Sequence, residues 1–222
     1  PTPPIDTLFP YTTLFRSAAD SGRTVVVTTT THILRHPGLP LVEEPTPERL
    51  RAALEGHGVV TVGTVFRGDK LSGAGTPEEL RRAADVVLVE ADGAKRLPLK
   101  APAEYEPVIP PCADAVAAVA GMDAVGQAVG AVCHRPERVC ALLGAGAEHV
   151  LTPEDVALLL ANPQGGRKGV GEAMAFRCVL NKADTPERAA HASAVAGRLA
   201  ERGIHSAITY YREEERGGLC WF

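Results

Sequence analysis

The chain of 222 residues carries 23 Lys and Arg against 27 Asp and Glu, which gives a formal net charge of −4. This balance argues against a polyanionic partner such as bulk nucleic acid, while a small anionic ligand remains compatible with it. The length suits one large domain with a substantial core.

The five cysteines are odd in number and are never spaced as C-x-x-C, which argues against a disulfide framework and against a zinc site. Reduced thiols in the cytosol fit this usage best. No apolar run approaches the roughly 18 residues that are needed to cross a bilayer, and no charged and then apolar leader opens the chain. We therefore expect a cytoplasmic protein with no membrane partner and no nucleic acid partner.

The first residues differ in composition from the rest of the chain, which is rich in Ala, Val, Glu and Arg. Residues 7–17 read TLFPYTTLFRS, and this string resembles one reading frame of a common sequencing adapter. We expect residues 1–17 to be an adapter-derived artefact that has replaced the native start, and residues 18–222 to form a single α/β nucleotide-binding domain. The alternative is a genuine short strand and turn.

Residues 18–23 have the character of a helix end, with Gly22 as the residue that follows the last turn. Short apolar runs rich in β-branched residues come next and alternate with helices along the chain. They are continuous rather than alternating in polarity, as in strands that helices cover on both faces, so we predict an α/β fold with a mostly parallel sheet. The predicted strands cover residues 24–27, 59–65, 86–89 and 178–180.

Four hydroxyl residues, 28–31, follow the first predicted strand and are too polar to continue it inside the core. They are expected at its carboxyl end, where open α/β sheets bind ligands. Thr30 or Thr31 could ligate Mg²⁺, contact a γ-phosphate or hold an attacking water. For His32 a structural role is the preferred interpretation.

Four Thr-Pro-Glu triplets predict helix starts. The threonine hydroxyl can accept from a free N–H of the first turn, proline presets φ, and the acid meets the positive end of the helix dipole. Thr76 and Glu79 also match a capping box. The four predicted caps are Thr46, Thr76, Thr152 and Thr185.

The strand 86–89 runs directly into an acidic loop, Glu90-Ala91-Asp92-Gly93-Ala94-Lys95. Carboxylates at this end of a parallel strand suit Mg²⁺, so Glu90 and Asp92 are candidate metal ligands and catalytic groups. Gly93 would allow close approach of a phosphate, and Lys95 could meet its charge. The alternative is an ordinary polar loop. The proline-rich stretch 98–111 that follows reads as a functional or covering loop.

A glycine-rich basic segment, residues 164–169 (QGGRKG), could close over anionic groups as a lid or could be a mobile connector.

Farther along, Asn181-Lys182-Ala183-Asp184 follows a predicted strand, 176–180, and precedes a capped helix. In GTP-binding proteins N-K-x-D occupies this setting: the aspartate accepts from guanine N–H groups, and the asparagine supports the base and the loop. Guanine recognition is therefore predicted, with an accidental helix cap as the alternative.

The chain resembles the YqeC family, accessory proteins of selenium-dependent molybdenum hydroxylases, in collinear order over residues 18–200. The resemblance implies a P-loop NTPase-like three-layer sandwich and a glycine-rich phosphate loop near the start. No G-x-x-x-x-G-K-[ST] sequence occurs in residues 1–222, so we expect the first strand and the phosphate loop to be missing. The matching blocks are VVVTTTTHI (25–33), VVLVEADGAKRLPLKAPAEYEPVIP (86–110), HRPE (134–137), LTPEDVALLL (151–160), QGGRKG (164–169) and LNKAD (180–184).

Together these features predict a protein that binds GTP, or ATP, with Mg²⁺ and assists a molybdenum hydroxylase or its cofactor-maturation proteins. An NTPase activity is expected for an intact family member, and an impaired or inactive site for this chain, since positioning and charge neutralisation drive phosphoryl transfer. The alternative is a non-hydrolysing carrier or insertion module for molybdenum cofactor or selenium, with Cys112, Cys133 and Cys140 as soft ligands. Buried structural cysteine is the commoner fate of such residues.

Overall fold

The computed structural model describes residues 18–210 and 218–221. Its contacts divide the chain into two compact units. Unit 1 comprises Pro1–Gly93 and Val108–Cys112, and unit 2 comprises Ala94–Pro107 and Ala113–Phe222. The expectation of one domain over residues 18–222 stays a prediction.

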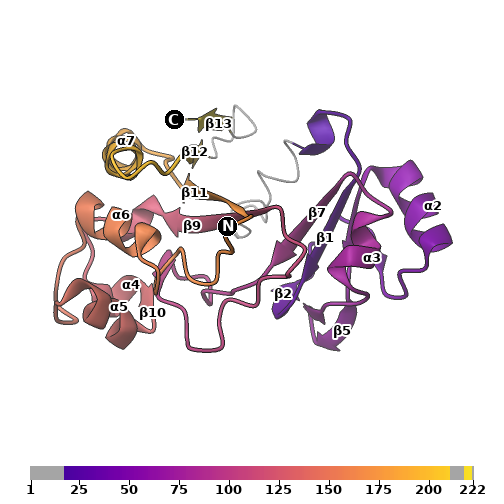
Figure 1. Ribbon diagram of the computed structural model, residues 1–222, viewed down its shortest axis with the longest axis horizontal. Helices are drawn as coiled ribbons and strands as arrows, with labels where there is room; N and C mark the ends of the chain where they lie inside the picture. The colour runs from indigo at the N-terminus through magenta and orange to yellow at the C-terminus, as the bar shows by residue number, and fades with distance from the viewer. Residues whose placement is uncertain (1–17, 211–217, 222) are drawn as a thin grey trace. The chain divides into compact units, whose positions relative to one another are not determined.

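Unit 1 is built on a four-stranded sheet in the order β3-β4-β1-β7 (Figure 1), and every neighbouring pair of these strands is parallel. The apolar composition of the strands explains their central position, because β1 is buried along its whole length. The strands are β1 (Val25–Thr29), β3 (Leu41–Val42), β4 (Val59–Val62) and β7 (Val86–Glu90).

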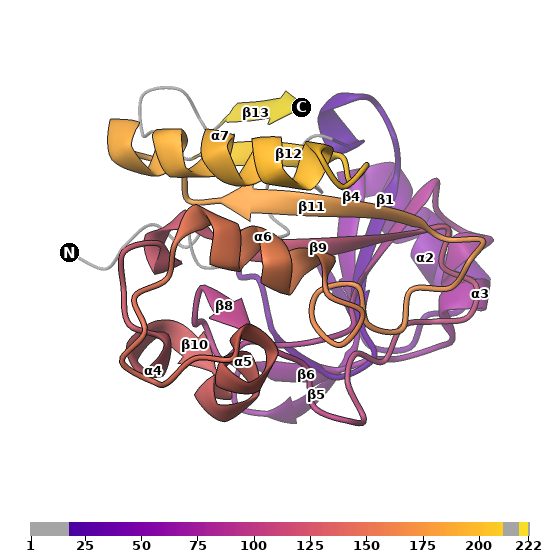
Figure 2. The ribbon, with the colours of Figure 1, turned by 60° about the vertical axis from the view of Figure 1, so that its left-hand side comes forward.

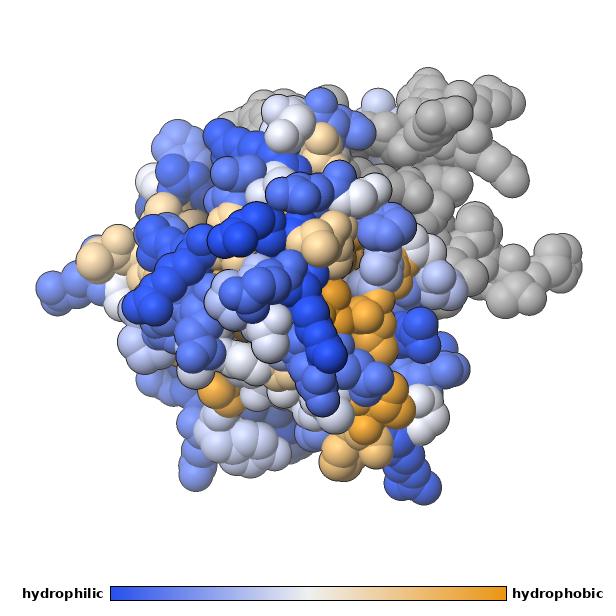
Figure 3. All heavy atoms as spheres, turned by 90° about the vertical axis from the view of Figure 1, so that its right-hand side faces the viewer, coloured by the Kyte–Doolittle hydropathy of each residue, from blue (hydrophilic) through white to orange (hydrophobic). Residues whose placement is uncertain are grey.

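Helices α2 (Pro47–His57) and α3 (Pro77–Arg81) cover one face of this sheet. Leu50 and Leu54 of α2 and Leu80 of α3 pack against the strands, while the remaining surface of α2 is largely polar. Figure 3 views this side of the molecule and shows a predominantly hydrophilic surface with a small apolar area. The buried residues of this cluster are Val26, Leu50, Leu54, Val60, Val62, Leu80 and Ala84.

A small antiparallel sheet, β2-β6-β5, completes unit 1. Its strands are β2 (His32–Leu34), β5 (Thr64–Arg67) and β6 (Lys70–Ser72). The prediction of one strand over 59–65 was wrong, because the chain leaves the parallel sheet at Gly63. A side chain on Gly63 would place its Cβ 2.7 Å from the Ser72 carbonyl oxygen, so glycine allows the two backbones to meet there.

Unit 2 contains a second sheet, in the order β13-β12-β11-β9 (Figure 2). Strands β9, β11 and β12 are parallel, and β13 pairs antiparallel with β12. A separate parallel pair, β8 with β10, lies beside α4 (Val129–Val132) and α5 (Pro136–Leu143). The strands are β8 (Leu99–Lys100), β9 (Ala115–Gly121), β10 (Cys133–His134), β11 (Ala175–Asn181), β12 (Ser206–Tyr210) and β13 (Gly218–Trp221).

The helices α6 and α7 pack on one face of the β9-β11-β12 strands and enclose the larger core of the chain. Phe176, Cys178 and Leu180, which lie on one face of β11, belong to this core. The helical elements of unit 2 are η2 (Met122–Ala124), α4 (Val129–Val132), α5 (Pro136–Leu143), α6 (Pro153–Ala161) and α7 (Pro186–Ala200).

All four predicted helix starts are confirmed. Each threonine is extended, its hydroxyl accepts from the backbone N–H three residues later, and proline occupies the first turn. The capping box of Thr76 and Glu79 is present, with the Thr76 N–H 2.9 Å from the Glu79 carboxylate. The predicted helix end near residue 22 is also confirmed, since Gly22 has φ 76°, the Gly22 N–H donates to the Ala19 carbonyl and the Arg23 N–H donates to the Ala18 carbonyl.

The α/β fold class with mostly parallel strands is confirmed, and it is compatible with a P-loop-like sandwich. The adapter-like segment, residues 1–17, lies outside the described residues, so its origin and the missing phosphate loop stay predictions. Among the residues that the structure describes, no helix has the length and apolar character needed to cross a bilayer.

Candidate functional site

The carboxyl end of β1 carries the four predicted hydroxyl residues. The expectation that all four are too polar to continue the strand inside the core was wrong for Thr28 and Thr29, which belong to β1 and are buried with their hydroxyls hydrogen-bonded. The buried Thr28 hydroxyl donates to the Val62 carbonyl at 2.9 Å, and the buried Thr29 hydroxyl donates to the Glu90 carbonyl at 2.8 Å. Two threonines therefore link β1 to both neighbouring strands, β4 and β7, at the point where all three end. The Glu90 carbonyl also accepts from the Thr30 N–H at 3.1 Å, so backbone and side-chain bonds together hold this edge of the sheet.

Thr30 and Thr31 continue this edge and are half-buried. The Thr30 hydroxyl donates to the Val108 carbonyl at 2.6 Å, which fixes its rotamer. The Thr31 hydroxyl lies 3.2 Å from Thr29 Oγ1, which also accepts from the Thr31 N–H at 2.8 Å. Each hydroxyl oxygen keeps lone pairs with which it can accept a hydrogen bond or ligate a hard cation.

The acidic loop begins beside these threonines, because Glu90 pairs with Thr29 in the parallel register of β7 and β1. Glu90, Asp92 and Gly93 are all half-buried. A Cβ on Gly93 would lie 3.3 Å from Glu90 Oε1, so the absence of a side chain leaves room for that carboxylate. Unit 1 thus brings Thr30, Thr31, Glu90, Asp92 and Gly93 to one edge of its sheet.

A cavity of about 440 Å³ opens at this edge. Its lining is dominated by hydroxyl groups and glycine backbone, which can donate to or accept from a polar ligand at close range. The lining residues are Thr28, Thr29, Thr30, Thr31, Ser72, Gly73, Gly75, Pro77 and Val108.

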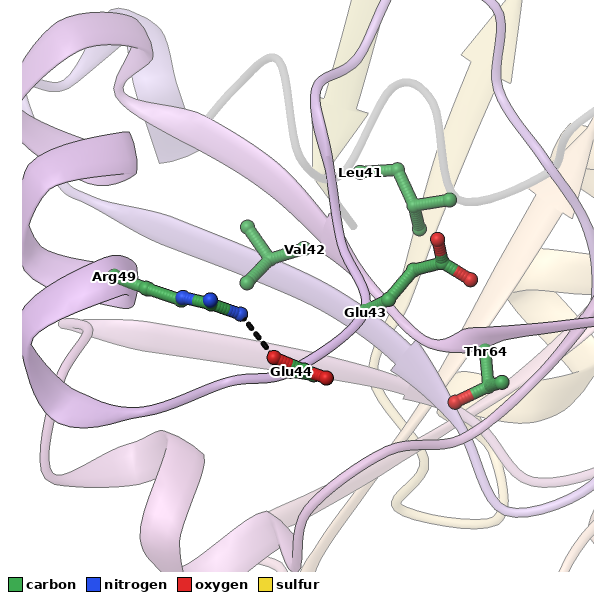
Figure 4. A pocket seen from close by; sticks show the side chains of 6 residues that line it. All are labelled: Leu41, Val42, Glu43, Glu44, Arg49 and Thr64. Carbon is green, nitrogen blue, oxygen red and sulfur yellow. Dashed lines mark hydrogen bonds and ion pairs between the residues drawn. The ribbon is translucent and has the colours of Figure 1, made fainter.

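A second hollow, of about 700 Å³, lies farther along the same edge, at the ends of β3 and β4 (Figure 4). Arg49 pairs with Glu44 across it, and both side chains are mostly exposed, so this ion pair adds little stability. The Glu43 carboxylate accepts from the Val65 N–H at 3.3 Å. The sequence reading did not single out these acids, although they follow the short apolar run of β3.

His32, for which a structural role was predicted, is exposed on β2, where its ring contacts the Phe66 ring in a tilted arrangement with the centroids 4.4 Å apart. This contact gives the imidazole a packing role in the small antiparallel sheet.

In unit 2 the loop Asn181 to Asp184 has the local setting that was predicted for it. It follows β11 and precedes α7, whose cap is Thr185. The Asn181 side-chain oxygen accepts from the Thr209 hydroxyl at 2.8 Å, and the Ala183 N–H donates to the Thr209 carbonyl at 3.1 Å. The loop is therefore anchored to the end of β12.

The charged members of this loop contact other groups of unit 2. Lys182 has φ 61°, in the left-handed region, and its ammonium lies 2.7 Å from Asp123 Oδ2. Asp184 lies 3.8 Å from Arg188, one turn along α7. Asp123 was missed by the sequence reading. Its place follows from the pairing of Gly121 with Asn181, which puts the loops after β9 and β11 side by side.

The predicted site residues thus fall into two sets. Unit 1 holds Thr30, Thr31, Glu90, Asp92 and Gly93. Lys95, with φ 51°, belongs to unit 2 together with the loop Asn181 to Asp184. Their assembly into one nucleotide site stays a prediction.

Residues 164–169 form a packed turn, which disfavours both a lid and a mobile connector. A Cβ on Gly165 would lie 2.2 Å from the Leu159 carbonyl oxygen, so this glycine lets the turn press against the end of α6. The Lys168 ammonium donates to the Ala103 and Glu104 carbonyls. Arg167 lies over the Phe176 ring at 5.7 Å. The basic side chains of this turn are engaged within unit 2.

The cysteines give no support to a soft ligand set. Burial raises the pKa of Cys133 to about 11 and that of Cys178 to about 12, so both thiols are protonated at neutral pH. Cys112 belongs to unit 1, whereas Cys133 and Cys140 belong to unit 2. Within residues 18–210 and 218–221, no group of three or more His, Cys, Asp or Glu side chains could hold a metal ion.

Comparison with known proteins gives two findings that agree. The family model described as YqeC protein matches residues 11–137. The uncharacterized protein YqeC of Escherichia coli (strain K12) is 30% identical over 199 residues, which cover 84% of this chain and 76% of that protein. No solved structure matches the chain.

Proposed function

The chain belongs to the YqeC family, and from this premise we propose that it is a cytoplasmic nucleotide-binding accessory protein in the maturation of selenium-dependent molybdenum hydroxylases. GTP is the expected nucleotide, ATP the alternative, and Mg²⁺ the expected metal ion. Its protein partner would be the hydroxylase or one of the proteins that mature its cofactor.

The observation that carries the proposal is the polar edge of the unit 1 sheet. Strands β1, β4 and β7 are parallel and end together, and Thr29 and Glu90 are paired at that end. Open parallel sheets bind ligands at their carboxyl ends, near the point where the chain changes direction across the sheet. In unit 1 the chain runs from β1 outward to β3 and then back past β1 to β7, so the cavity beside β1 occupies such a position.

The donor set fits a hard divalent cation. Glu90 and Asp92 supply carboxylate oxygens and Thr31 supplies a hydroxyl, and oxygen ligands of this kind suit Mg²⁺. Bound there, Mg²⁺ would neutralise phosphate charge. Glu90 and Asp92 would orient water around it, and Thr30, held by Val108, would present its hydroxyl oxygen to a phosphate group.

Base recognition is proposed for the loop Asn181 to Asp184. The Asp184 carboxylate would accept from the two N–H groups on one edge of guanine, which adenine does not offer. Asn181, bonded to Thr209, and Lys182, bonded to Asp123, would hold the loop in place.

The strength of nucleotide binding and the rate of hydrolysis would depend on a phosphate-binding loop. Since no G-x-x-x-x-G-K-[ST] sequence occurs in the 222 residues, we expect this polypeptide to bind nucleotide weakly and to hydrolyse it very slowly, because the cradle amides and lysine supply much of the positioning. The carrier alternative is the second hypothesis, and in it the buried Cys133 thiol would have to lose its proton on binding a soft ligand.

The test is a titration of the full chain with fluorescent GTP and ATP analogues, with Mg²⁺ and with EDTA. We expect Mg²⁺-dependent binding that is at least about tenfold tighter for GTP, a difference of about 1.4 kcal/mol. Asp184→Asn should remove this preference, because one acceptor oxygen becomes an N–H₂ donor that faces the guanine N–H groups.

Glu187→Gln is the matched control, since it removes the same charge at an exposed position of the same helix start. It should leave the preference intact. The absence of saturable binding of either nucleotide, with Mg²⁺ present and with protein at about 1 mM, would contradict the proposal.

A further inference from the structure

The HRPE segment, residues 134–137, has no role in the proposed nucleotide site. Its first residue, His134, ends β10, the short strand that pairs in parallel with β8 beside α5 (Figure 2). The register of this pair sets His134 directly opposite Lys100. Arg135 follows at once and precedes the first residue of α5. A histidine and two cations are therefore gathered at one place in unit 2.

An internal ion network fixes these cations. Glu106 accepts from the Lys100 ammonium at 2.9 Å and from both terminal nitrogens of Arg135, at 2.6 and 2.9 Å. The side chains are at most 20% exposed. Arg135 also lies over the Tyr105 ring, 6.0 Å from its centroid. The positively charged groups are consequently held in position before any ligand arrives.

His134 adds a polar atom whose bonding capacity is unused. Its Nδ1 is buried and has no hydrogen-bond partner among the described residues. A buried ring nitrogen without a partner costs free energy, which a ligand atom in that place would recover.

The charge around His134 is predominantly positive. Burial lowers the pKa of His134, and the charges of Arg135, Lys100 and Lys95 lower it further, while Glu106 raises it. Of these four charged groups three are cations and one is an anion. The imidazole therefore lies in a field that disfavours another cation and favours an arriving anion.

The backbone at the two loops that carry these cations is unusual. Lys95, Arg96 and Arg135 have φ of 51°, 65° and 60°, in the region that residues with side chains rarely adopt. Such conformations cost free energy and persist where the surrounding structure, or a function, requires them.

We propose that His134, together with Lys95, Lys100 and Arg135, forms a binding site for a small oxyanion, namely a phosphate or carboxylate group. Lys and Arg can only donate, and an Nδ1–H on His134 would donate to an oxygen of the ligand. Glu106 offsets one of the three positive charges and leaves two for the ligand. The oxyanion could be free phosphate or the phosphate of a larger molecule, and the experiment separates these sources.

The experiment follows the His134 ring resonances of the full chain by NMR during a pH titration, in inorganic phosphate and in chloride at equal ionic strength. An oxyanion at this site stabilises the protonated imidazole, so the pKa of His134 should rise in phosphate. A rise of one pKa unit means that phosphate binds tenfold more tightly to the protonated form.

Two variants and one control test whether Lys95 and His134 bind the phosphate. Lys95→Ala and His134→Ala should each weaken phosphate binding at least about fivefold in a titration of the full chain near pH 6. Lys70→Ala removes the same charge at an exposed position of unit 1 and should have no effect. Circular dichroism melts of the variants check that each is folded.

The proposal is overturned if phosphate up to about 50 mM neither shifts the His134 titration nor binds saturably, or if both variants bind as the wild type does. GTP is titrated in parallel. Weakening of phosphate and GTP binding together by His134→Ala assigns the site to a nucleotide phosphate, and weakening of phosphate binding alone assigns it to a separate anion. Because phosphate is tested alone, failure of GTP binding leaves this result intact.

Discussion

Among the carboxylates that the structure describes, Glu106 has the most strongly lowered pKa. Its burial alone would raise its pKa, but the hydrogen bonds from Arg135 and Lys100 lower it to about 2. A carboxyl group with a pKa below its unfolded value stabilises the fold at higher pH. That contribution is complete above about pH 4.5 and is lost as the pH falls toward 2.

We therefore predict that Glu106→Gln lowers the free energy of unfolding by on the order of 2 kcal/mol at pH 7, since it leaves two cations partly buried without their counter-ion. Urea denaturation at pH 7, 4 and 2.5 measures this, and the difference from wild type should shrink as the pH falls. Glu104→Gln, at a 92% exposed carboxylate, should cost under about 0.5 kcal/mol. Equal costs for the two variants would refute the assignment.

Gly73 lines the 440 Å³ cavity of unit 1 and lies against the backbone of β1. A Cβ there would lie 2.2 Å from the Thr29 carbonyl oxygen, a backbone atom that cannot move without disturbing β1. We predict that Gly73→Ala destabilises the chain by about 1–3 kcal/mol, measured by urea denaturation. Gly56→Ala, inside α2 with nothing within 4 Å of the added Cβ, should instead stabilise by up to about 1 kcal/mol. Effects of the same sign would contradict this account.

The N-terminus of helix α6 is capped by a reciprocal pair of hydrogen bonds and by an additional contact with a histidine. The Thr152 hydroxyl accepts from the Asp155 N–H at 3.2 Å, and Asp155 Oδ2 accepts from the Thr152 N–H at 2.8 Å and lies 2.9 Å from His149 Nε2. We predict that Thr152→Ala costs about 1 kcal/mol of stability, while Thr152→Ser, which keeps the oxygen, costs less than half of that. Chemical denaturation of the two variants decides this, and a serine variant as unstable as the alanine variant would show that the cap oxygen is not the cause.

The elements also show which parts of the fold the sequence could predict. Helix starts were predicted correctly because a cap is a contact between residues three apart, and all of its determinants lie in one short segment. Strand β9 was missed because its sequence, AVAAVAG, lacks the β-branched run that identified the others. Asp123 was missed with it, since its contact with Lys182 arises only when β9 and β11 pair across some 60 residues.

At the scale of the whole molecule, the mostly parallel α/β class followed from the order of apolar runs and caps. The division of its contacts into two units did not, because it depends on where residues 94–112 cross from one unit to the other and back. The same limit applies to the candidate site. The sequence predicted that each polar loop lies at the end of a strand. Which strand ends are neighbours is decided by pairing between strands that are far apart in the sequence.

The thiols provide a chemical test of the fold as a whole. With pKa values of about 11 and about 12, Cys133 and Cys178 should carry at least roughly 100-fold less thiolate than an unperturbed cysteine at pH 8. We predict that a water-soluble thiol reagent labels both slowly in the native chain and rapidly in urea, with mass spectrometry to locate the label. The half-buried Cys140 is the internal comparison, and labelling of Cys178 as fast as that of Cys140 would be incompatible with the packing of β11.

The threonine edge of β1 has a spectroscopic consequence. The Thr28 and Thr29 hydroxyls are each buried and each donates to a carbonyl oxygen, so their protons should exchange with water far more slowly than ordinary hydroxyl protons do. Slowly exchanging hydroxyl protons give resolved NMR signals. The two hydroxyl protons would thus report on the carboxyl end of β1 without an added label. Their NMR signals should shift when a ligand or a metal ion binds beside them.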